Sequence, residues 1–163
     1  MMLTAERLRE IMDYDPASGV FTRRVAMRCA PAGVVIAGTP DGGYLAATIE
    51  RRKYRLHRLA WLYVNGEWPA EHIDHINGDR ADNRIANLRA ATCAENCRNR
   101  GANRNNRLGL KGVSAPLPSG RYRARIRVDR REIYIGLFDT AREAHAAYAS
   151  AARVLHGDFA RAA

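Results

Sequence analysis

The segment from Glu71 to Asn96 concentrates the side chains of this chain that could do chemistry. Its sequence, EHIDHINGDRADNRIANLRAATCAEN, contains two histidines, five acidic residues and several asparagines. Oxygen donors such as Asp74 and Asn96 would suit Mg²⁺, which keeps much of its hydration shell and often takes further ligands from a phosphate. A neutral imidazole such as that of His75 can accept a proton from water that attacks a phosphodiester. The segment therefore indicates metal-assisted hydrolysis of a phosphate ester.

A short strand is expected to carry the first of these groups. Ile73 and Ile76 predict this strand, and the Asn-Gly pair at residues 77–78 predicts a tight turn at its end. Asp74 and His75 would face opposite sides of a regular strand, so a twist or a loop must bring both to one site. A loop rich in Asp and Asn is expected to follow the turn.

A helix is expected after this loop. Thr92 and Glu95 have the spacing of a capping box, which predicts a helix that starts at Cys93. Asn96 would then lie about one turn into the helix, where it could face Asp74. The order strand, loop, helix is thus the expected framework of the site.

Other polar residues of the segment have simpler interpretations. The amide of Asn87 could hold the loop or orient the imidazole of His75. Asp79 and Asp82 are expected to cap turns. His72 is interpreted as an exposed or hydrogen-bonding side chain.

The remaining histidines and the cysteines are expected to be structural. His57 is interpreted as a structural residue or a phosphate contact, and His145 and His156 as surface residues. Cys93 and Cys97 lie four residues apart on the predicted helix and are expected to pack in the core. The chain has three cysteines, an odd number without the spacing of a disulfide framework, which indicates a reducing compartment.

Three separated motifs resemble those of one nuclease family. HRLAW at residues 57–61, HIDHINGDRADNRIANL at 72–88 and AEN at 94–96 resemble an HNH endonuclease of the phage homing type. The resemblance covers roughly residues 40–100 and implies a ββα-metal catalytic finger. It also implies DNA products with 5′-phosphate and 3′-hydroxyl ends, cut one strand at a time by a single finger.

The same resemblance implies a role for four residues. Asp74 and Asn96 would bind the divalent metal, His75 would be the general base, and Asn87 would support the loop. Many HNH enzymes have histidine where this chain has Asn96. The asparagine keeps the site all-oxygen, which favours Mg²⁺ or Mn²⁺ over a softer metal.

The net charge of +10 comes from one contiguous part of the chain. Residues 98–131 contain eleven Lys or Arg and one acidic residue, whereas the rest of the chain contains sixteen of each sign. Such a local imbalance is typical of a segment that binds nucleic acid. The residues expected to bind DNA are Arg98, Arg100, Arg104, Arg107, Lys111, Arg121, Arg123, Arg125 and Arg127.

The last third of the chain has the pattern of a small antiparallel sheet covered by one helix. In GRYRARIRV, residues 120–128, arginines alternate with Tyr, Ala, Ile and Val, so the arginines would share one strand face. EIYIGLF at 132–138 predicts a second strand, and KGVSA at 111–115 a possible first one. Thr140 and Glu143 form a second capping box, which predicts the helix. Its expected apolar stripe is Ala144, Ala147, Tyr148, Ala151 and Leu155.

Residues from about 108 to 162 resemble the ethylene-response-factor (APETALA-type) DNA-binding domain of plants, most specifically in YIGLFDTAREAHAAY. This domain also occurs as the DNA-binding arm of phage HNH endonucleases. The resemblance implies a three-stranded sheet that lies in the major groove of DNA. Tyr122 stands where tryptophan is common, and SAPLPSG replaces a more aromatic and basic first turn, whereas the arginine face is kept.

The N-terminal part is expected to consist of short helices and strands. MMLTAERLREIMDYDP predicts a short amphipathic helix that stops before Pro16, without the features of a signal peptide. A turn and a short strand are expected in DPASGVFTRR, and then two strands and a helix that ends near Gly66. The sequence has no long apolar span, so we expect a cytoplasmic protein without a membrane partner.

The sequence thus predicts an α+β chain with three parts. These are a nuclease domain at 1–97, a basic linker at 98–110 that becomes ordered on its partner, and a DNA-binding domain at 111–163. The expected function is a metal-dependent, homing-type HNH endonuclease that acts on double-stranded DNA as a monomer or homodimer. The main alternative is a non-catalytic DNA-binding protein or transcription regulator with a degenerate finger, and a second is an RNA-binding or RNA-cleaving protein.

Overall fold

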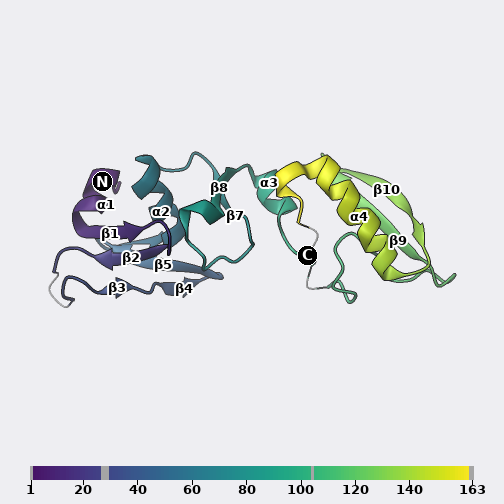
Figure 1. Ribbon diagram of the computed structural model, residues 1–163, viewed down its shortest axis with the longest axis horizontal. Helices are drawn as coiled ribbons and strands as arrows, with labels where there is room; N and C mark the ends of the chain where they lie inside the picture. Colours follow the sequence, from purple (N-terminus) through teal and green to yellow (C-terminus); the bar gives the residue numbers. More distant parts are fainter. Residues whose placement is uncertain (1, 27–29, 104, 162–163) are drawn as a thin grey trace. The chain divides into compact units, whose positions relative to one another are not determined.

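The computed structural model describes residues 2–26, 30–103 and 105–161 as short helices and antiparallel strands (Figure 1). The predicted α+β class is confirmed. The chain divides into two compact units, residues 1–93 and 94–163, each with apolar clusters of its own. The functional boundaries expected at residues 97 and 110 stay predictions. None of the helices in the described ranges has the length and apolar character needed to cross a membrane.

The first unit consists of small antiparallel sheets and two α-helices. The strand orders of its sheets are β1-β2-β3, β4-β5-β6 and β7-β8. Its elements are α1 (Ala5–Ile11), β1 (Met12–Asp15), β2 (Val20–Arg23), β3 (Val35–Ile36), β4 (Thr39–Asp41), β5 (Tyr44–Ile49), β6 (Arg52–Arg55), α2 (Leu56–Asn65), β7 (His72–His75), the 3-10 helix η1 (Ile85–Asn87) and β8 (Leu88–Ala91).

One apolar core joins these elements. Leu8 of α1, Phe21 of β2 and Leu59 of α2 are fully buried at its centre. Ile73 and Leu88 extend the same core into the β7–β8 hairpin and so anchor the strands that carry the candidate site. The predicted end of α2 is confirmed, because the helix closes at Gly66 in the left-handed conformation that glycine adopts readily.

The predicted extent of the first helix is wrong. The helix α1 ends at Ile11, and residues 12–15 form β1, paired with β2. Met12 and Tyr14 are buried and alternate with exposed acidic residues, which is the period of a strand. Tyr14 lies opposite Phe21 with the ring centroids 4.7 Å apart, so packing against the core decides the conformation here.

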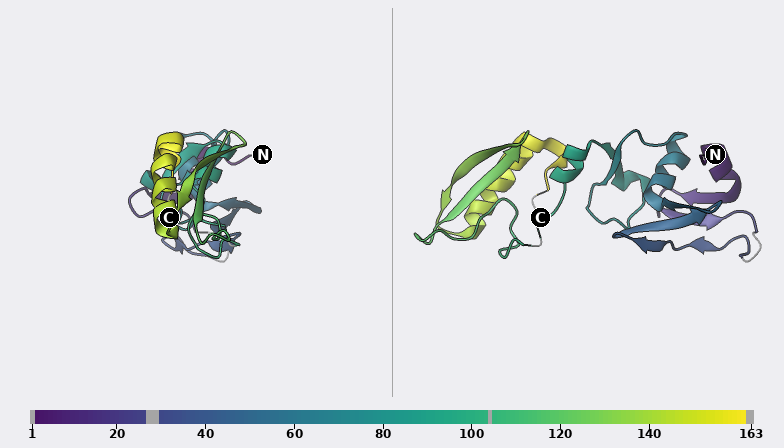
Figure 2. Two further views of the ribbon diagram at one scale, coloured as in Figure 1. Left: turned by 90° about the vertical axis from the view of Figure 1, so that its right-hand side faces the viewer. Right: turned by 180° about the vertical axis from the view of Figure 1, so that it is seen from behind.

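The second unit is a β-hairpin covered by one long helix, as Figures 1 and 2 show. The helix α3, predicted to start at Cys93, is confirmed and begins at the boundary between the units. The elements from this point on are α3 (Cys93–Arg98), β9 (Tyr122–Val128), β10 (Arg131–Phe138), α4 (Ala141–His156) and the 3-10 helix η2 (Gly157–Phe159).

The predicted alternation of β9 is confirmed, but the described sheet has two strands where three were expected. Ala124 and Ile126 are buried, and the intervening arginines are exposed. In place of a third strand, Val113 makes an isolated bridge to Ala124. The prolines at residues 116 and 118 lack the N–H group that a regular ladder needs beyond this bridge.

The capping box of α4 is confirmed, with hydrogen bonds in both directions between Thr140 and Glu143. The predicted apolar stripe is only partly right. Leu155 is 42% exposed, and the buried positions follow a four-residue period. The buried residues of the helix are Ala144, Tyr148, Ala149, Ala152 and His156. The expectation that His156 lies on the surface is therefore wrong.

Gly19, in the turn between β1 and β2, lets this hairpin contact the loop before η1. Its φ is +75°, and a Cβ atom there would lie 2.5 Å from the backbone nitrogen of Arg84 and 2.6 Å from the carbonyl carbon of Asn83. The Tyr14 hydroxyl donates to the Asn83 carbonyl at 2.8 Å in the same contact. The hairpin thereby supports the loop of the candidate site.

We predict that Gly19→Ala destabilises the protein more than Gly33→Ala. Both positions have positive φ, so each alanine adds about 1–2 kcal/mol of left-handed backbone strain. A Cβ atom added at Gly33 has no other atom within 4 Å. The Gly19→Ala variant should lose a further 1–3 kcal/mol, roughly, of unfolding free energy, because its added Cβ overpacks the surrounding backbone. Urea unfolding measures the free energy of unfolding of both variants. Equal losses of this free energy would contradict a tight contact between Gly19 and the loop before η1.

Candidate active site

The β7–β8 hairpin holds the two adjacent residues that are central to the candidate site. Asp74 pairs with Arg89 and His75 with Leu88 in the antiparallel register. The side chains of adjacent strand residues point to opposite faces, yet Asp74 is only 3% exposed and His75 only 4%. Both faces of the strand end are therefore covered, and both polar groups lie in desolvated surroundings.

Asp74 forms an ion pair with Arg89 across the hairpin. Its Oδ2 atom accepts from Arg89 Nε at 2.8 Å and lies 2.7 Å from Nη2. A buried carboxylate requires such a partner, because an uncompensated charge at low exposure is costly. The sequence analysis missed Arg89, which only the register of the hairpin identifies as the residue opposite Asp74.

His75 belongs to a cluster of three rings. The His57 ring lies edge-on to the His75 ring at 5.0 Å between centroids, and Tyr44 lies 4.9 Å from His57 and 5.9 Å from His75. His57 is buried at the start of α2. The interpretation of His57 as structural did not foresee its contact with His75, because the two residues come from separate elements.

Burial keeps both imidazoles neutral near pH 7. It lowers the pKa of His57 to about 3, and the charges of His75, Arg55 and Arg58 act in the same direction. It also lowers the pKa of His75, against the opposing effects of the Asn83 side chain and of nearby acidic groups such as Asp74. A neutral imidazole can accept a proton, so His75 is in the form that a general base needs.

Tyr44 holds two arginines next to these histidines. The guanidinium carbons of Arg55 and Arg80 lie 4.5 Å and 4.8 Å from the centroid of its ring, within the range of cation–π interactions. Arg80 also donates to the Gly42 carbonyl at 3.1 Å. The sequence analysis missed this group, since its members come from β5, from β6 and from the loop after β7, with no common spacing.

Asn87 fixes the turn that follows His75. Its Oδ1 atom accepts from the Asn77 amide at 3.0 Å, and its Nδ2 atom donates to the Asp82 carbonyl at 2.9 Å. Its backbone carbonyl accepts from the Ile76 amide at 2.9 Å. The side chain therefore bridges both ends of the loop, which is the arrangement expected of a residue that supports it.

The two aspartates of this loop cap turns, as predicted. Asp79 accepts from the Ala81 amide at 2.9 Å and Asp82 from the Arg84 amide at 3.3 Å. The loop is thus held by local hydrogen bonds between side chains and backbone.

Asn96 lies on α3, in the second unit, whereas Asp74, His75 and Asn87 lie together in the first. The pairing of Asn96 with Asp74 at a metal site stays a prediction. Among the residues that the structure describes, no group of three His, Cys, Asp or Glu side chains is placed to hold a metal ion.

The expectation of buried cysteines on α3 is wrong. Cys93 and Cys97 are both exposed, because this short helix buries none of its described side chains. The expectation for His72 is confirmed, since it is exposed at the start of β7.

The arginines predicted to bind DNA are in several environments. Arg123 and Arg127 are exposed on β9. Arg125 pairs with Glu132 at 3.0 Å. Arg121 precedes the strand and pairs with Asp139 at 3.1 Å. These exposed ion pairs are weak and leave the guanidinium groups available to phosphates.

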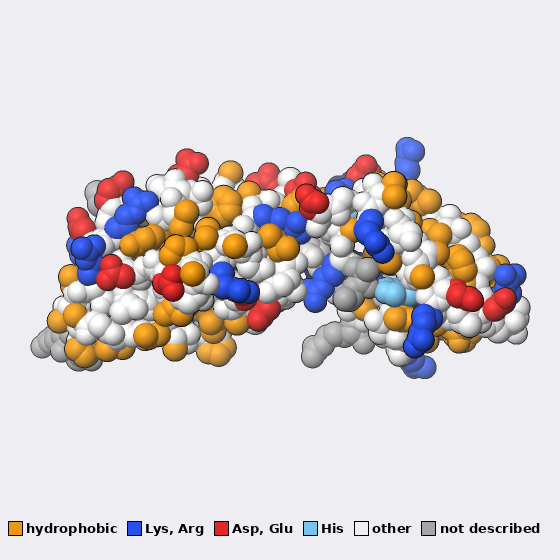
Figure 3. Space-filling model, viewed as in Figure 1, with side chains coloured by type: hydrophobic (Ala, Val, Ile, Leu, Met, Phe, Trp, Pro, Cys, Tyr) orange, Lys and Arg blue, Asp and Glu red, His pale blue; other side chains and the backbone are white. Residues whose placement is uncertain are grey.

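The predicted DNA-binding residues before β9 also differ from one another. Arg100 and Arg107 are exposed and Lys111 is half-buried, while Arg98 pairs with Asp129 at 3.3 Å. Arg104 lies outside the described residues. On the face shown in Figure 3, acidic and basic side chains of the first unit are interspersed, in keeping with the balanced charge outside residues 98–131.

Comparison with known proteins places these residues in a family. The family model of HNH endonucleases matches residues 54–98, a range that contains the β7–β8 hairpin and α3. Protein 3.8 of Escherichia phage T7 is 32% identical over 118 residues, which cover 66% of this chain and 88% of that protein. No solved structure matches the chain. The chain therefore belongs to the same family as Protein 3.8 of phage T7 and carries an HNH endonuclease domain.

Proposed function

We propose that this protein is a metal-dependent DNA endonuclease of the homing type, in which β7, β8 and α3 form a ββα-metal finger. The observation that carries the proposal is the buried, neutral imidazole of His75 next to the buried carboxylate of Asp74, inside the matched range. A general base and a metal ligand at adjacent positions could together activate water and stabilise the charge that develops on the phosphate.

His75 accepts the proton of the attacking water in this proposal. The water oxygen forms a bond to phosphorus, the bond from phosphorus to the 3′ oxygen breaks, and the 3′ oxygen takes up a proton. The products are a 5′-phosphate and a 3′-hydroxyl end. Asn87 acts as a positioning residue, because it holds the turn that begins directly after His75.

Asp74 and Asn96 would hold the divalent metal. Their carboxylate and amide oxygens fit Mg²⁺ or Mn²⁺, and the small number of protein ligands leaves room for water and phosphate oxygens. When bound, the metal would stabilise negative charge on the phosphate and on the leaving oxygen. Arg89 holds the Asp74 carboxylate in place on the hairpin through their ion pair.

Arg55 and Arg80 are placed to bind a DNA phosphate near His75. Tyr44 positions both guanidinium groups through its ring, and the same ring lies 5.9 Å from that of His75. Arginine binds phosphate oxygens with paired hydrogen bonds. These residues would therefore orient the backbone of the substrate next to the base.

The second unit is proposed to bind double-stranded DNA through the exposed face of β9. Arg123 and Arg127 project from this face. Ala124 and Ile126 alternate with the arginines, and their side chains pack under α4. Arginines at such positions can contact guanine edges or phosphates. This arm, with boundaries at residues 111–163 and a basic linker at 98–110, would set where the nuclease acts.

We predict that His75→Ala abolishes cleavage of plasmid DNA and leaves DNA binding unchanged. Loss of a general base costs about 10²–10⁴-fold in rate. His72→Ala, an exposed histidine on the same strand, is the matched control and should keep wild-type activity. Gel analysis of cleavage and a mobility-shift assay check both properties. Cleavage by His75→Ala at the wild-type rate would sink the assignment.

We predict that Asp74→Asn weakens binding of Mn²⁺, measured by electron paramagnetic resonance of the free ion. Mutation of residues outside the coordination shell typically lowers metal affinity by about 10–100-fold. Replacement of a metal ligand should lower the Mn²⁺ affinity by more than this. Asp79→Asn is the control, because Asp79 is an exposed acidic residue of the same region that caps a turn. Equal affinity in both variants would contradict a metal site at Asp74.

We predict that Tyr44→Phe keeps the cleavage activity and that Tyr44→Leu lowers it. Phenylalanine retains the ring that positions the guanidinium groups, whereas leucine does not. The loss in Tyr44→Leu should appear mainly as a higher KM, because substrate positioning is weakened while His75 remains. Steady-state kinetics separate the two parameters, and similar kinetics of both variants would argue against this role of the ring.

A further inference from the structure

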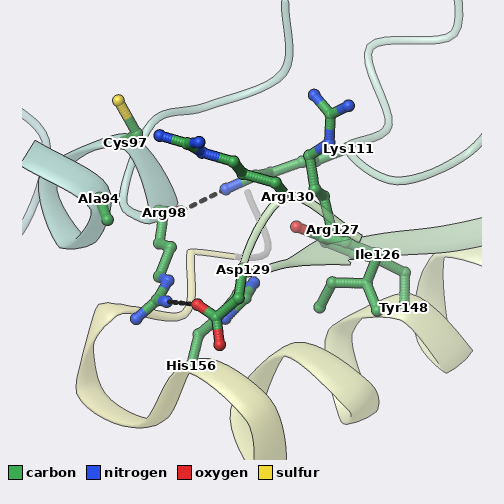
Figure 4. Close-up of a pocket in the computed structure, with 10 residues that line it drawn as sticks. All are labelled: Ala94, Cys97, Arg98, Lys111, Ile126, Arg127, Asp129, Arg130, Tyr148 and His156. Atoms are coloured by element: carbon green, nitrogen blue, oxygen red, sulfur yellow. Dashed lines mark hydrogen bonds and ion pairs between the residues drawn. The ribbon is translucent and has the colours of Figure 1, made fainter. Parts of the chain in front are cut away.

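A cavity of about 640 Å³ lies in the second unit, at the turn end of the β9–β10 hairpin (Figure 4). Its walls come from this turn, from α3 and from α4. Ile126 and Tyr148 form an apolar wall, and both are almost completely buried. The volume lies within the range of about 300–1,000 Å³ that is typical of ligand sites.

The charged residues of this cavity are mainly cations. Arg98, Lys111, Arg127 and Arg130 line it, and Asp129 is its acidic residue. Asp129 pairs with Arg98 at 3.3 Å, but its side chain is 83% exposed, so water screens this pair. The cavity therefore holds three more positive charges than negative ones, an arrangement that favours an anionic ligand.

The surroundings of two buried groups agree with this charge excess. Lys111 donates to the Arg98 carbonyl at 2.5 Å, and burial, with the charge of Arg161, lowers its pKa to about 8. Burial, together with the charge of Arg98, also lowers the pKa of His156. A bound anion would relieve the unfavourable burial of the Lys111 ammonium group.

We propose that the cavity binds a phosphate group of the DNA backbone, as an anchoring contact separate from the β7–β8 hairpin. This inference rests on the proposed function, because it assumes that the chain acts on DNA. The lining supplies three guanidinium groups and one ammonium group, the side-chain groups that bind phosphate oxygens. The charged residues of the cavity belong to the basic segment of residues 98–131, so a bound duplex is the nearest source of such an anion.

The first test compares two equivalent arginines. Arg130 and Arg51 are each the second residue of a two-residue turn that begins with an acid, and their φ angles are +66° and +64°. Arg130 lines the cavity, and Arg51 lies in the β5–β6 turn of the first unit. Substitution to glutamine thus removes one charge from the same backbone setting in both cases.

Binding of a duplex without terminal phosphates is measured against salt concentration, with EDTA and in the His75→Ala background. Arg130→Gln should lower the slope of log Kd against log salt by about one, because one phosphate contact is lost. Arg51→Gln should leave the slope unchanged. The same slope in both variants would overturn the cavity as a phosphate site.

The second test uses the exposed thiol of Cys97, which lines the cavity. Cys93 is exposed on the same helix but is not part of the lining, so it serves as the control. Variants that retain only one of these thiols, in a Cys29→Ser background, are treated with N-ethylmaleimide. The duplex should slow the reaction of Cys97 more than that of Cys93.

The outcomes separate this proposal from the proposed function. Protection of Cys97 by inorganic phosphate but not by the duplex would overturn the assignment to the DNA backbone. A wild-type protein that does not bind the duplex at all would contradict the proposed function as well. Binding of the duplex without protection of Cys97, and without a change of slope in Arg130→Gln, would contradict the cavity proposal alone.

Discussion

The ion pair between Asp74 and Arg89 is the interaction on which the candidate site depends. A carboxylate that is 3% exposed would be unstable without a partner, and Arg89 supplies one directly across the hairpin. A shift of the register by one residue would turn Arg89 to the other face and leave the charge unpaired. The register in turn sets where His75 lies, and Ile73 and Leu88 hold it against the core.

The surroundings of His75 follow from this placement. Because the strand end is covered on both faces, the imidazole is desolvated and stays neutral, as the lowered pKa shows. His57 and Tyr44 fill the space beside it with rings, and Tyr44 adds two arginines at the margin. A neutral base next to positive charge is suited to a phosphate diester, since the base can accept a proton while the cations attract the substrate.

Sequence reasoning succeeded where the signal was local. The capping box at Thr140, the glycine at the end of α2 and the alternation of β9 each depend on neighbouring residues, and the structure contains all three. It failed where packing between distant elements decides. Residues 12–15 form β1 and not the predicted end of a helix, because Tyr14 packs on Phe21. His156 is buried, although a surface residue was expected. Arg89 became recognisable only through the register of β7 and β8.

The proposed function requires that the chain hydrolyses DNA with a divalent metal. The most direct measurement is incubation of the purified wild-type protein with supercoiled plasmid, with Mg²⁺ or with EDTA, followed by gel electrophoresis and analysis of the cut ends. We expect open-circular or linear DNA with Mg²⁺ only, with 5′-phosphate ends that a ligase can rejoin. Intact plasmid with both Mg²⁺ and Mn²⁺, together with a clear mobility shift of the same DNA, would contradict it and favour a non-catalytic DNA-binding protein.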